Sequence, residues 1–285
     1  MVKYISRVIF TILILSSTYS IQAKTGQEIL DNIVFRYSDT ILACQSNESP
    51  AYACSGAVVH GVGSGMPWAP PSDNSMSFSY LRKDVLNPLY GNYGYGIILI
   101  PQNDIVGNLY KPDYRCTFPI NGGSNDRLDN GCGAFGDTIE LEPTAPCQKN
   151  GIFDGISWAD QFNSLFRFCG FDLKGKWGDK PEHAFNAMLE ASTINIETNN
   201  RLENNEIVIN SWGNTPLDML PIEAIYYLNN QGATIHLNNA REAQIEYTLQ
   251  TGKWIPIIQL EKINSETGYG YNYKFAFYDN DQAIE

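Results

Sequence analysis

Four residues of this chain combine side-chain chemistry with a placement that could bind or cleave a sugar-containing molecule. His60 ends an apolar run and is followed by Gly61, and a glycine lets a ligand come close to the backbone. The imidazole of His60 could donate a hydrogen bond to a ribose hydroxyl or pair with a phosphate. Ser77 and Ser79 alternate with apolar residues, which indicates that both hydroxyls lie on one face of a strand.

Glu206 is the candidate acid, because it opens the apolar run 207–209. A carboxylate at the start of a packed strand is held rigidly and can stabilise an oxocarbenium-like sugar cation or orient the group that attacks it. Each of these residues also has a structural explanation. His60 could be a structural polar residue, the two serines the solvated face of a strand, and Glu206 a charge that guards a sheet edge.

The six cysteines are better explained as scaffolding than as catalysts. All of them follow a predicted export signal, and an exported chain with an even number of cysteines is expected to pair them. A paired sulfur is neither a nucleophile nor a zinc ligand. Neighbours in the sequence suggest three pairs, although other pairings stay open: Cys44–Cys54, Cys116–Cys132 and Cys147–Cys169.

Several common catalytic motifs are missing from the sequence. The three histidines do not have the spacing of a zinc site, and no G-x-S-x-G or G-x-x-x-x-G-K-[ST] segment occurs. We therefore predict no metal and no resident cofactor.

The first 23 residues are predicted to be a signal peptide. Lys3 and Arg7 precede the short apolar run 8–15, and Ala23 is a small residue suited to signal peptidase. This segment holds two of the 19 basic residues and none of the 31 acidic ones, so the remainder has a net charge of −14. We expect a secreted or periplasmic protein with no integral membrane segment after cleavage and no attraction to nucleic acid.

Helices and strands follow each other in an order that predicts an α+β fold. Thr25 and Glu28 have the spacing of a capping box, which marks the start of the first helix. Helices are expected over 26–42, from Ser157, from Pro181 to about 192, and over roughly 239–250. Strands are expected over 57–61, 75–82, 95–100, 206–210, 222–228, 254–260 and 274–278.

This order lacks the regular strand–helix alternation of a doubly wound fold. We predict a single exported α+β domain over residues 24–285, with mixed or antiparallel sheets and flanking helices. Residues 119–151 are rich in Gly, Asn, Asp and Pro, and the surrounding stretch from about 116 to 170 contains four of the cysteines. We interpret that stretch as an irregular excursion with disulfide-stapled loops.

Several segments together resemble a family of secreted proteins, the halovibrin-like proteins. The resemblance covers most of the chain after the signal and includes all six cysteines. It is carried by residues 53–61, 77–82, 116–119, 130–133, 169–172, 205–206 with Trp212, and 252–258.

The resemblance implies an ADP-ribosyltransferase-like core that acts on NAD, as an NAD glycohydrolase or as an ADP-ribosyltransferase toxin or effector. NAD is then a substrate rather than a cofactor, and a host protein is the acceptor in the transferase version. The residue roles that it implies are NAD ribose binding by His60 with Gly61, a nicotinamide cleft lined by Ser77, Ser79 and Tyr80, and catalysis by Glu206.

One departure from the family pattern favours hydrolysis over transfer. The first position of the paired acidic motif is occupied by Asn204, and transfer to a protein normally relies on that position. The alternative from another class is a secreted, non-enzymatic binding protein that recognises a glycan or a host surface with its 17 tyrosines and five tryptophans.

Overall fold

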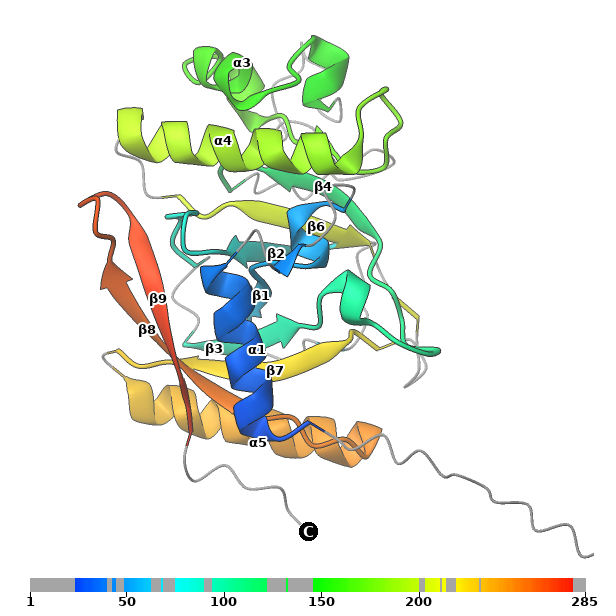
Figure 1. Cartoon of the computed structure of the whole chain (residues 1–285), viewed down its shortest axis with the longest axis vertical. Helices are drawn as coiled ribbons and strands as arrows, with labels where there is room; N and C mark the ends of the chain where they lie inside the picture. Colours follow the sequence, from blue (N-terminus) through cyan, green and yellow to red (C-terminus); the bar gives the residue numbers. More distant parts are fainter. Residues whose placement is uncertain are drawn as a thin grey trace, which may run out of the picture.

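One nine-stranded mixed sheet runs through the molecule and carries helices on both faces, as the sequence predicts for the α+β class (Figure 1). This computed structural model describes residues 24–39, 43–44, 49–62, 68, 75–89, 94–121, 132, 146–199, 203–210, 212–213, 219–230 and 232–278. The predicted signal peptide, residues 1–23, lies outside the described residues. No helix in the described ranges is long and apolar enough to cross a membrane.

The strands are β1 (Ala57–Gly61), β2 (Ser75–Leu81), β3 (Tyr95–Leu99), β4 (Tyr114–Phe118), β5 (Phe171–Asp172), β6 (Glu206–Asn210), β7 (Ile222–Leu228), β8 (Ile257–Asn264) and β9 (Tyr271–Phe277). Their order across the sheet is β5-β4-β6-β2-β1-β3-β7-β8-β9. Neighbours are antiparallel except β7 and β8, which are parallel. A parallel pair needs a crossover connection, and the helix α5 supplies it.

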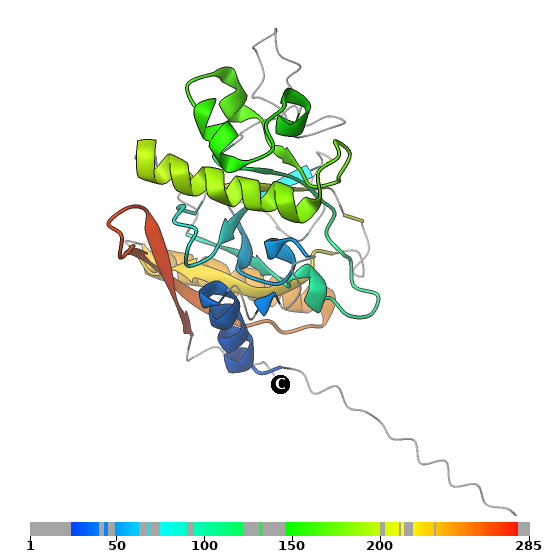
Figure 2. The ribbon, with the colours of Figure 1, turned by 45° about the horizontal axis from the view of Figure 1, so that its top comes forward.

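The helices are α1 (Gly26–Ser38), α3 (Gly155–Asp160), α4 (Pro181–Asn199) and α5 (Ala233–Thr251), with short 3₁₀ turns η1 (Ala51–Ala53), η2 (Gln102–Asp104), η3 (Cys147–Asn150) and η4 (Leu165–Phe168). Figure 1 shows α1 across the front of the sheet, with α4 and α5 towards opposite ends. Figure 2 shows α3 stacked on α4, on the side away from the sheet.

Alternate residues of the central strands pack on opposite faces of the sheet. We call one the α4/α5 face: here Val58, Phe78 and Ile207 pack in one core cluster with Phe185 of α4 and Tyr247 of α5. We call the other the α1 face: here Val59, Leu81 and Ile98 pack in a second cluster with Leu30 and Ile33 of α1. The face that a strand residue occupies therefore decides which helices it can meet.

The predicted capping box at the start of α1 is confirmed. The Thr25 hydroxyl accepts a hydrogen bond from the Glu28 backbone N–H at 3.2 Å, and the Glu28 carboxylate accepts from the Thr25 N–H at 2.7 Å. These bonds lower the pKa of Glu28. The helix ends at Ser38, short of the predicted residue 42.

A buried ion pair fixes α1 to the sheet. The Arg36 guanidinium donates two hydrogen bonds to the Glu223 carboxylate of β7, and the Nη1–Oε1 distance is 3.2 Å. Both side chains are less than a tenth exposed. Burial raises the pKa of Glu223, and the attraction of Arg36 offsets this only in part.

The three disulfides predicted from neighbouring positions are confirmed: Cys44–Cys54, Cys116–Cys132 and Cys147–Cys169. The part of the predicted irregular excursion that the structure describes contains the end of β4, η3, α3 and η4.

Several boundaries differ from the sequence prediction. β4 and β5 were not expected, because a buried strand of mixed residues such as β4 has no alternating pattern. The third helix, α4, extends to Asn199 rather than about 192, and α5 begins at Ala233 rather than near 239. β8 begins at Ile257, after Pro256, rather than at 254. β9 is the predicted last strand, and it lies at an edge of the sheet.

Candidate functional site

The structure brings Ser77 and Glu206 into direct contact. β2 and β6 pair antiparallel, with Ser77 opposite Val208 and Phe78 opposite Ile207, so the next pair along the register is Ser79 with Glu206. Directly opposite residues share a face of the sheet, which places both serines and Glu206 on the same side. The Ser77 hydroxyl donates a hydrogen bond to Oε1 of Glu206.

Glu206 is held by the strands on both of its sides. Its side chain meets Ser77 of β2, and its backbone carbonyl accepts a hydrogen bond from the Thr117 hydroxyl of β4 at 3.0 Å. Only 1% of Glu206 is exposed, and β6 lies inside the sheet rather than at an edge. Glu206 therefore does not guard a sheet edge, and it has the rigid setting expected of a positioned carboxylate.

A disulfide packs beside this carboxylate. Phe118 of β4 lies opposite Glu206, and Phe118, Cys116, Cys132 and Val208 form a small buried cluster. The Cys116–Cys132 bond is part of that cluster. This end of the site thus rests on apolar side chains tied together by a covalent link.

His60 lies on the opposite face of the sheet from Glu206. Val59 is opposite Ser79, so His60 falls opposite Phe78, and its ring centroid is 5.2 Å from that of Phe78. Nδ1 of His60 lies 2.7 Å from the Ser77 carbonyl oxygen. A carbonyl oxygen can only accept, so Nδ1 carries the hydrogen. His60 therefore contacts the backbone of Ser77 and does not reach the Glu206 face.

Gly61 follows Val59 by two residues and takes the Glu206 face, but it has no side chain to contribute, and Tyr80 lies on the other face. Gly61 pairs with Gly96 of β3, and a Cβ on Gly96 would lie 2.0 Å from the His60 carbonyl oxygen. The close approach that these glycines allow is thus between two strands. Tyr80 is fully buried on the α4/α5 face, where its hydroxyl lies 2.9 Å from that of Ser55. Of the predicted site residues, the structure brings together Ser77, Ser79 and Glu206.

Asn205 is a site residue that the sequence analysis missed. Its side-chain amide pairs with the backbone of Tyr80: Oδ1 accepts from the Tyr80 N–H at 2.7 Å, and Nδ2 donates to the Tyr80 carbonyl at 2.9 Å. The same Nδ2 also donates a hydrogen bond to Oδ1 of Asn87 at 3.3 Å. The side-chain amide of Asn205 thus continues the hydrogen bonding between β2 and β6 by one residue pair. It holds Asn205, which directly precedes Glu206, against β2.

We expect Asn205→Ala to lower the free energy of unfolding by about 1–3 kcal/mol, because the buried N–H and C=O of Tyr80 lose their partner. Urea unfolding of the variant beside the exposed-site variant Asn103→Ala measures this. Equal stability of the two variants would contradict the role given to Asn205.

We also expect a pH dependence from His60. Burial lowers its pKa below the ordinary 6.5, and the hydrogen bond to Ser77 offsets this only in part. Between about pH 6.5 and the lower folded-state pKa, the unfolded chain binds a proton that the folded chain does not, so stability falls as the pH drops through this window. Below the folded-state pKa the contribution is constant.

A His60→Gln variant lacks this titration, so its stability relative to the native chain should improve as the pH is lowered through that window. Urea unfolding of both proteins at several pH values measures the difference. A difference that does not change with pH would show that His60 does not titrate on unfolding.

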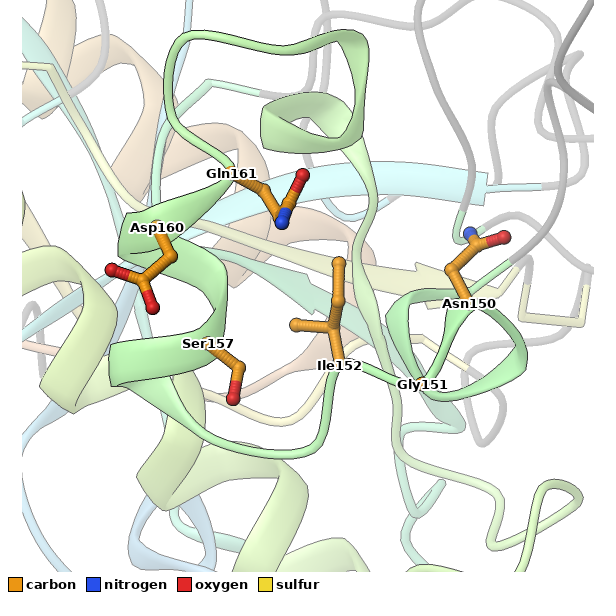
Figure 3. A pocket seen from close by; sticks show the side chains of 6 residues that line it. All are labelled: Asn150, Gly151, Ile152, Ser157, Asp160 and Gln161. Carbon is orange, nitrogen blue, oxygen red and sulfur yellow. The ribbon is translucent and has the colours of Figure 1, made fainter.

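Two cavities lined by described residues contain none of the predicted site residues in their lining. One, of about 430 Å³, lies between α1 and the β8–β9 hairpin. The other, of about 320 Å³, lies between η3 and α3 (Figure 3). Within the described ranges no group of three or more His, Cys, Asp or Glu side chains could hold a metal ion.

Fold and site together define a disulfide-bonded α+β domain with a carboxylate–hydroxyl pair inside its sheet. No family model matches the chain, and no curated protein is significantly similar to it. Membership of the halovibrin-like family therefore stays a prediction.

Proposed function

We propose that this protein cleaves NAD at the bond between nicotinamide and ribose, with Glu206 as the catalytic residue. The observation that carries the proposal is the hydrogen bond from Ser77 to Glu206 across two neighbouring strands. The halovibrin-like resemblance assigned catalysis to Glu206 and the nicotinamide cleft to Ser77, Ser79 and Tyr80. Of these residues, Ser77, Ser79 and Glu206 share one face of the sheet, and Tyr80 lies on the other.

In the proposed reaction the protein orients NAD and stabilises the positive charge that develops on the ribose. The bond between C1′ of the ribose and the nicotinamide nitrogen breaks, and the electron pair leaves with the nicotinamide, which becomes neutral. The positive charge moves to the ribose as an oxocarbenium ion. A negative Glu206, fixed by Ser77 and Thr117, stabilises that charge. Water then adds its oxygen to C1′ and releases a proton, giving ADP-ribose.

The position of His60 changes its proposed role. It cannot hold the ribose on the Glu206 face, because it lies on the other side of the sheet. Its hydrogen bond to the Ser77 carbonyl instead fixes the strand segment that carries the Ser77 hydroxyl. We assign His60 as a positioning residue.

The setting of Asn204 supports hydrolysis rather than transfer to a protein. Its side-chain amide donates to the Asn205 carbonyl at 3.1 Å, and only 8% of the residue is exposed. This residue therefore presents no carboxylate to an incoming acceptor, and water is the simplest one.

The test is to incubate the purified, oxidised, exported protein with NAD and to measure nicotinamide and ADP-ribose by chromatography. We expect equal amounts of the two products, and no labelling of added proteins when biotin-tagged NAD is used. Absence of turnover with NAD and with its ring analogues would overturn the proposal, and labelled protein would replace hydrolysis by transfer.

A further inference from the structure

The cavity between η3 and α3 has the composition of a site for a small neutral polyhydroxy compound. It is lined by Asn150, Gly151, Ile152, Ser157, Asp160 and Gln161. This set offers one carboxylate, two carboxamides, one hydroxyl and one aliphatic side chain. In Figure 3, Ser157 and Asp160 of α3 and the C-cap residue Gln161 lie on one side, Asn150 and Gly151 lie on the other, and Ile152 stands between them, with the Asp160 carboxylate directed away from Ile152.

The lining favours a neutral ligand rich in hydroxyl groups. No lining residue is cationic, so an anion would meet the Asp160 carboxylate without compensation. Asp160 is exposed and makes no hydrogen bond or ion pair with the described part of the chain, so its oxygens are available to accept from hydroxyl groups. Carboxamides can donate and accept at once, which suits hydroxyls that also do both.

The wall formed by η3 is held in place by covalent and backbone links. The Cys147–Cys169 disulfide joins η3 to the strand region near β5, and the Cys147 N–H donates to the Gly170 carbonyl at 2.8 Å. Gly151 ends η3 in the left-handed region, with φ of 78°, a conformation that favours glycine. This turn places Asn150 and Ile152 on the cavity.

The wall formed by α3 is fixed as well. Asp154 caps the helix by accepting from the Ser157 N–H at 2.7 Å, and the Gly155 N–H donates to the Glu190 carboxylate of α4 at 2.9 Å. A Cβ on Gly155 would lie 2.5 Å from the backbone of Ala191, so α3 sits directly on α4. Both walls are therefore formed before a ligand arrives, which lowers the entropic cost of binding.

Two residues that adjoin the lining residues in sequence are apolar and exposed. Phe153 is 49% exposed and follows Ile152, and Ile156 is 60% exposed and precedes Ser157. An aliphatic side chain such as Ile152 among polar groups suits a sugar, whose C–H faces are apolar and whose edge is polar.

We propose that this cavity binds a single sugar unit, separately from the reaction at Glu206. α4 lies between α3 and the sheet in Figures 1 and 2, so the two sites are on different sides of that helix. A ligand of this size in a small open site binds in the millimolar range. The site would hold the exported protein on a glycan-bearing surface.

The test uses methyl glycosides of the common hexoses and N-acetylhexosamines as probes, with saturation-transfer NMR on the purified oxidised protein. We expect at least one glycoside to bind, and Asp160→Asn with Gln161→Ala to weaken it at least about tenfold. Glu242→Gln on α5 is the matched charge control and should bind like the native chain.

No saturation transfer from any glycoside, or transfer that the Asp160/Gln161 variant leaves unchanged, would overturn the proposal. Binding that disappears with a chelator would also overturn it, since the ligand would then be a metal ion. Thermal unfolding of each variant shows that it is folded. NAD turnover is measured in parallel, and it should be the same in all these variants, so that failure of one proposal does not affect the other.

Discussion

Replacing Glu206 by Gln should reduce NAD cleavage at least about a hundredfold while leaving the protein folded. The substitution keeps the size of the side chain and an oxygen that can accept from Ser77, but it removes the negative charge. Loss of one preorganised electrostatic contact to a charged transition state typically costs two to three orders of magnitude, about 10²–10³, in rate. The measurement is the initial rate of nicotinamide release, with the KM for NAD determined separately.

Two further variants separate the charge from its positioning. Ser77→Ala keeps the carboxylate but removes its hydrogen bond, so we expect a smaller loss, mainly in kcat. Glu261→Gln removes the same charge at an exposed position of β8 and should retain native activity. If the native protein cleaves NAD and the Glu206→Gln variant cleaves it at the same rate, Glu206 has no part in the mechanism.

The largest effect on stability should come from Arg36→Met. This change leaves the Glu223 carboxylate buried without its partner, which typically costs about 3–5 kcal/mol of the free energy of unfolding. The remaining carboxylate has a folded-state pKa above its unfolded value, so the folded state binds the proton more tightly. Stability of the variant should therefore rise as the pH is lowered from neutral, as urea unfolding at each pH will show.

The double variant Arg36→Met with Glu223→Leu is the control for packing. Replacing both charges by apolar groups of similar volume removes the desolvation penalty, and it should restore most of the stability that the single change loses. The double variant should also lack the rise in the free energy of unfolding that the single variant shows as the pH is lowered. A double variant as unstable as the single one would assign the loss to packing of the Arg36 stem rather than to the unpaired carboxylate.

The fold was predictable wherever local chemistry determines the element. The capping box at Thr25, the alternation in β2 and the pairing of neighbouring cysteines all depend on residues close in sequence. β4 was missed because its residues do not alternate with a period of two. Tyr114 and Cys116 would share a face in a regular strand, but a bulge between them places the two side chains on opposite faces of the sheet. A bulge is set by the partner strand, which the sequence does not identify.

The site was predictable only in part for a similar reason. Ser77 and Ser79 could be assigned to one strand face from their spacing alone. Their contact with Glu206 could not be predicted, because it depends on the pairing of β2 with β6. The face of His60 could not be assigned, because it depends on the register between β1 and β2 and one step of register reverses every side chain. The part played by Asn205 depends on a backbone group 125 positions away, at Tyr80.

The central place of the β2–β6 pair has a consequence for folding. Ser77 and Glu206 are 129 positions apart, and their strands join one part of the sheet, β5-β4-β6, to all the rest. Contacts of such high sequence separation form slowly, because a long loop must close before they contribute. If the predicted signal peptide directs the unfolded chain to export, the carboxylate–hydroxyl pair forms only after the segment with Glu206 has crossed the membrane. If the protein cleaves NAD, late assembly would protect the nucleotide pool of the cell that makes it.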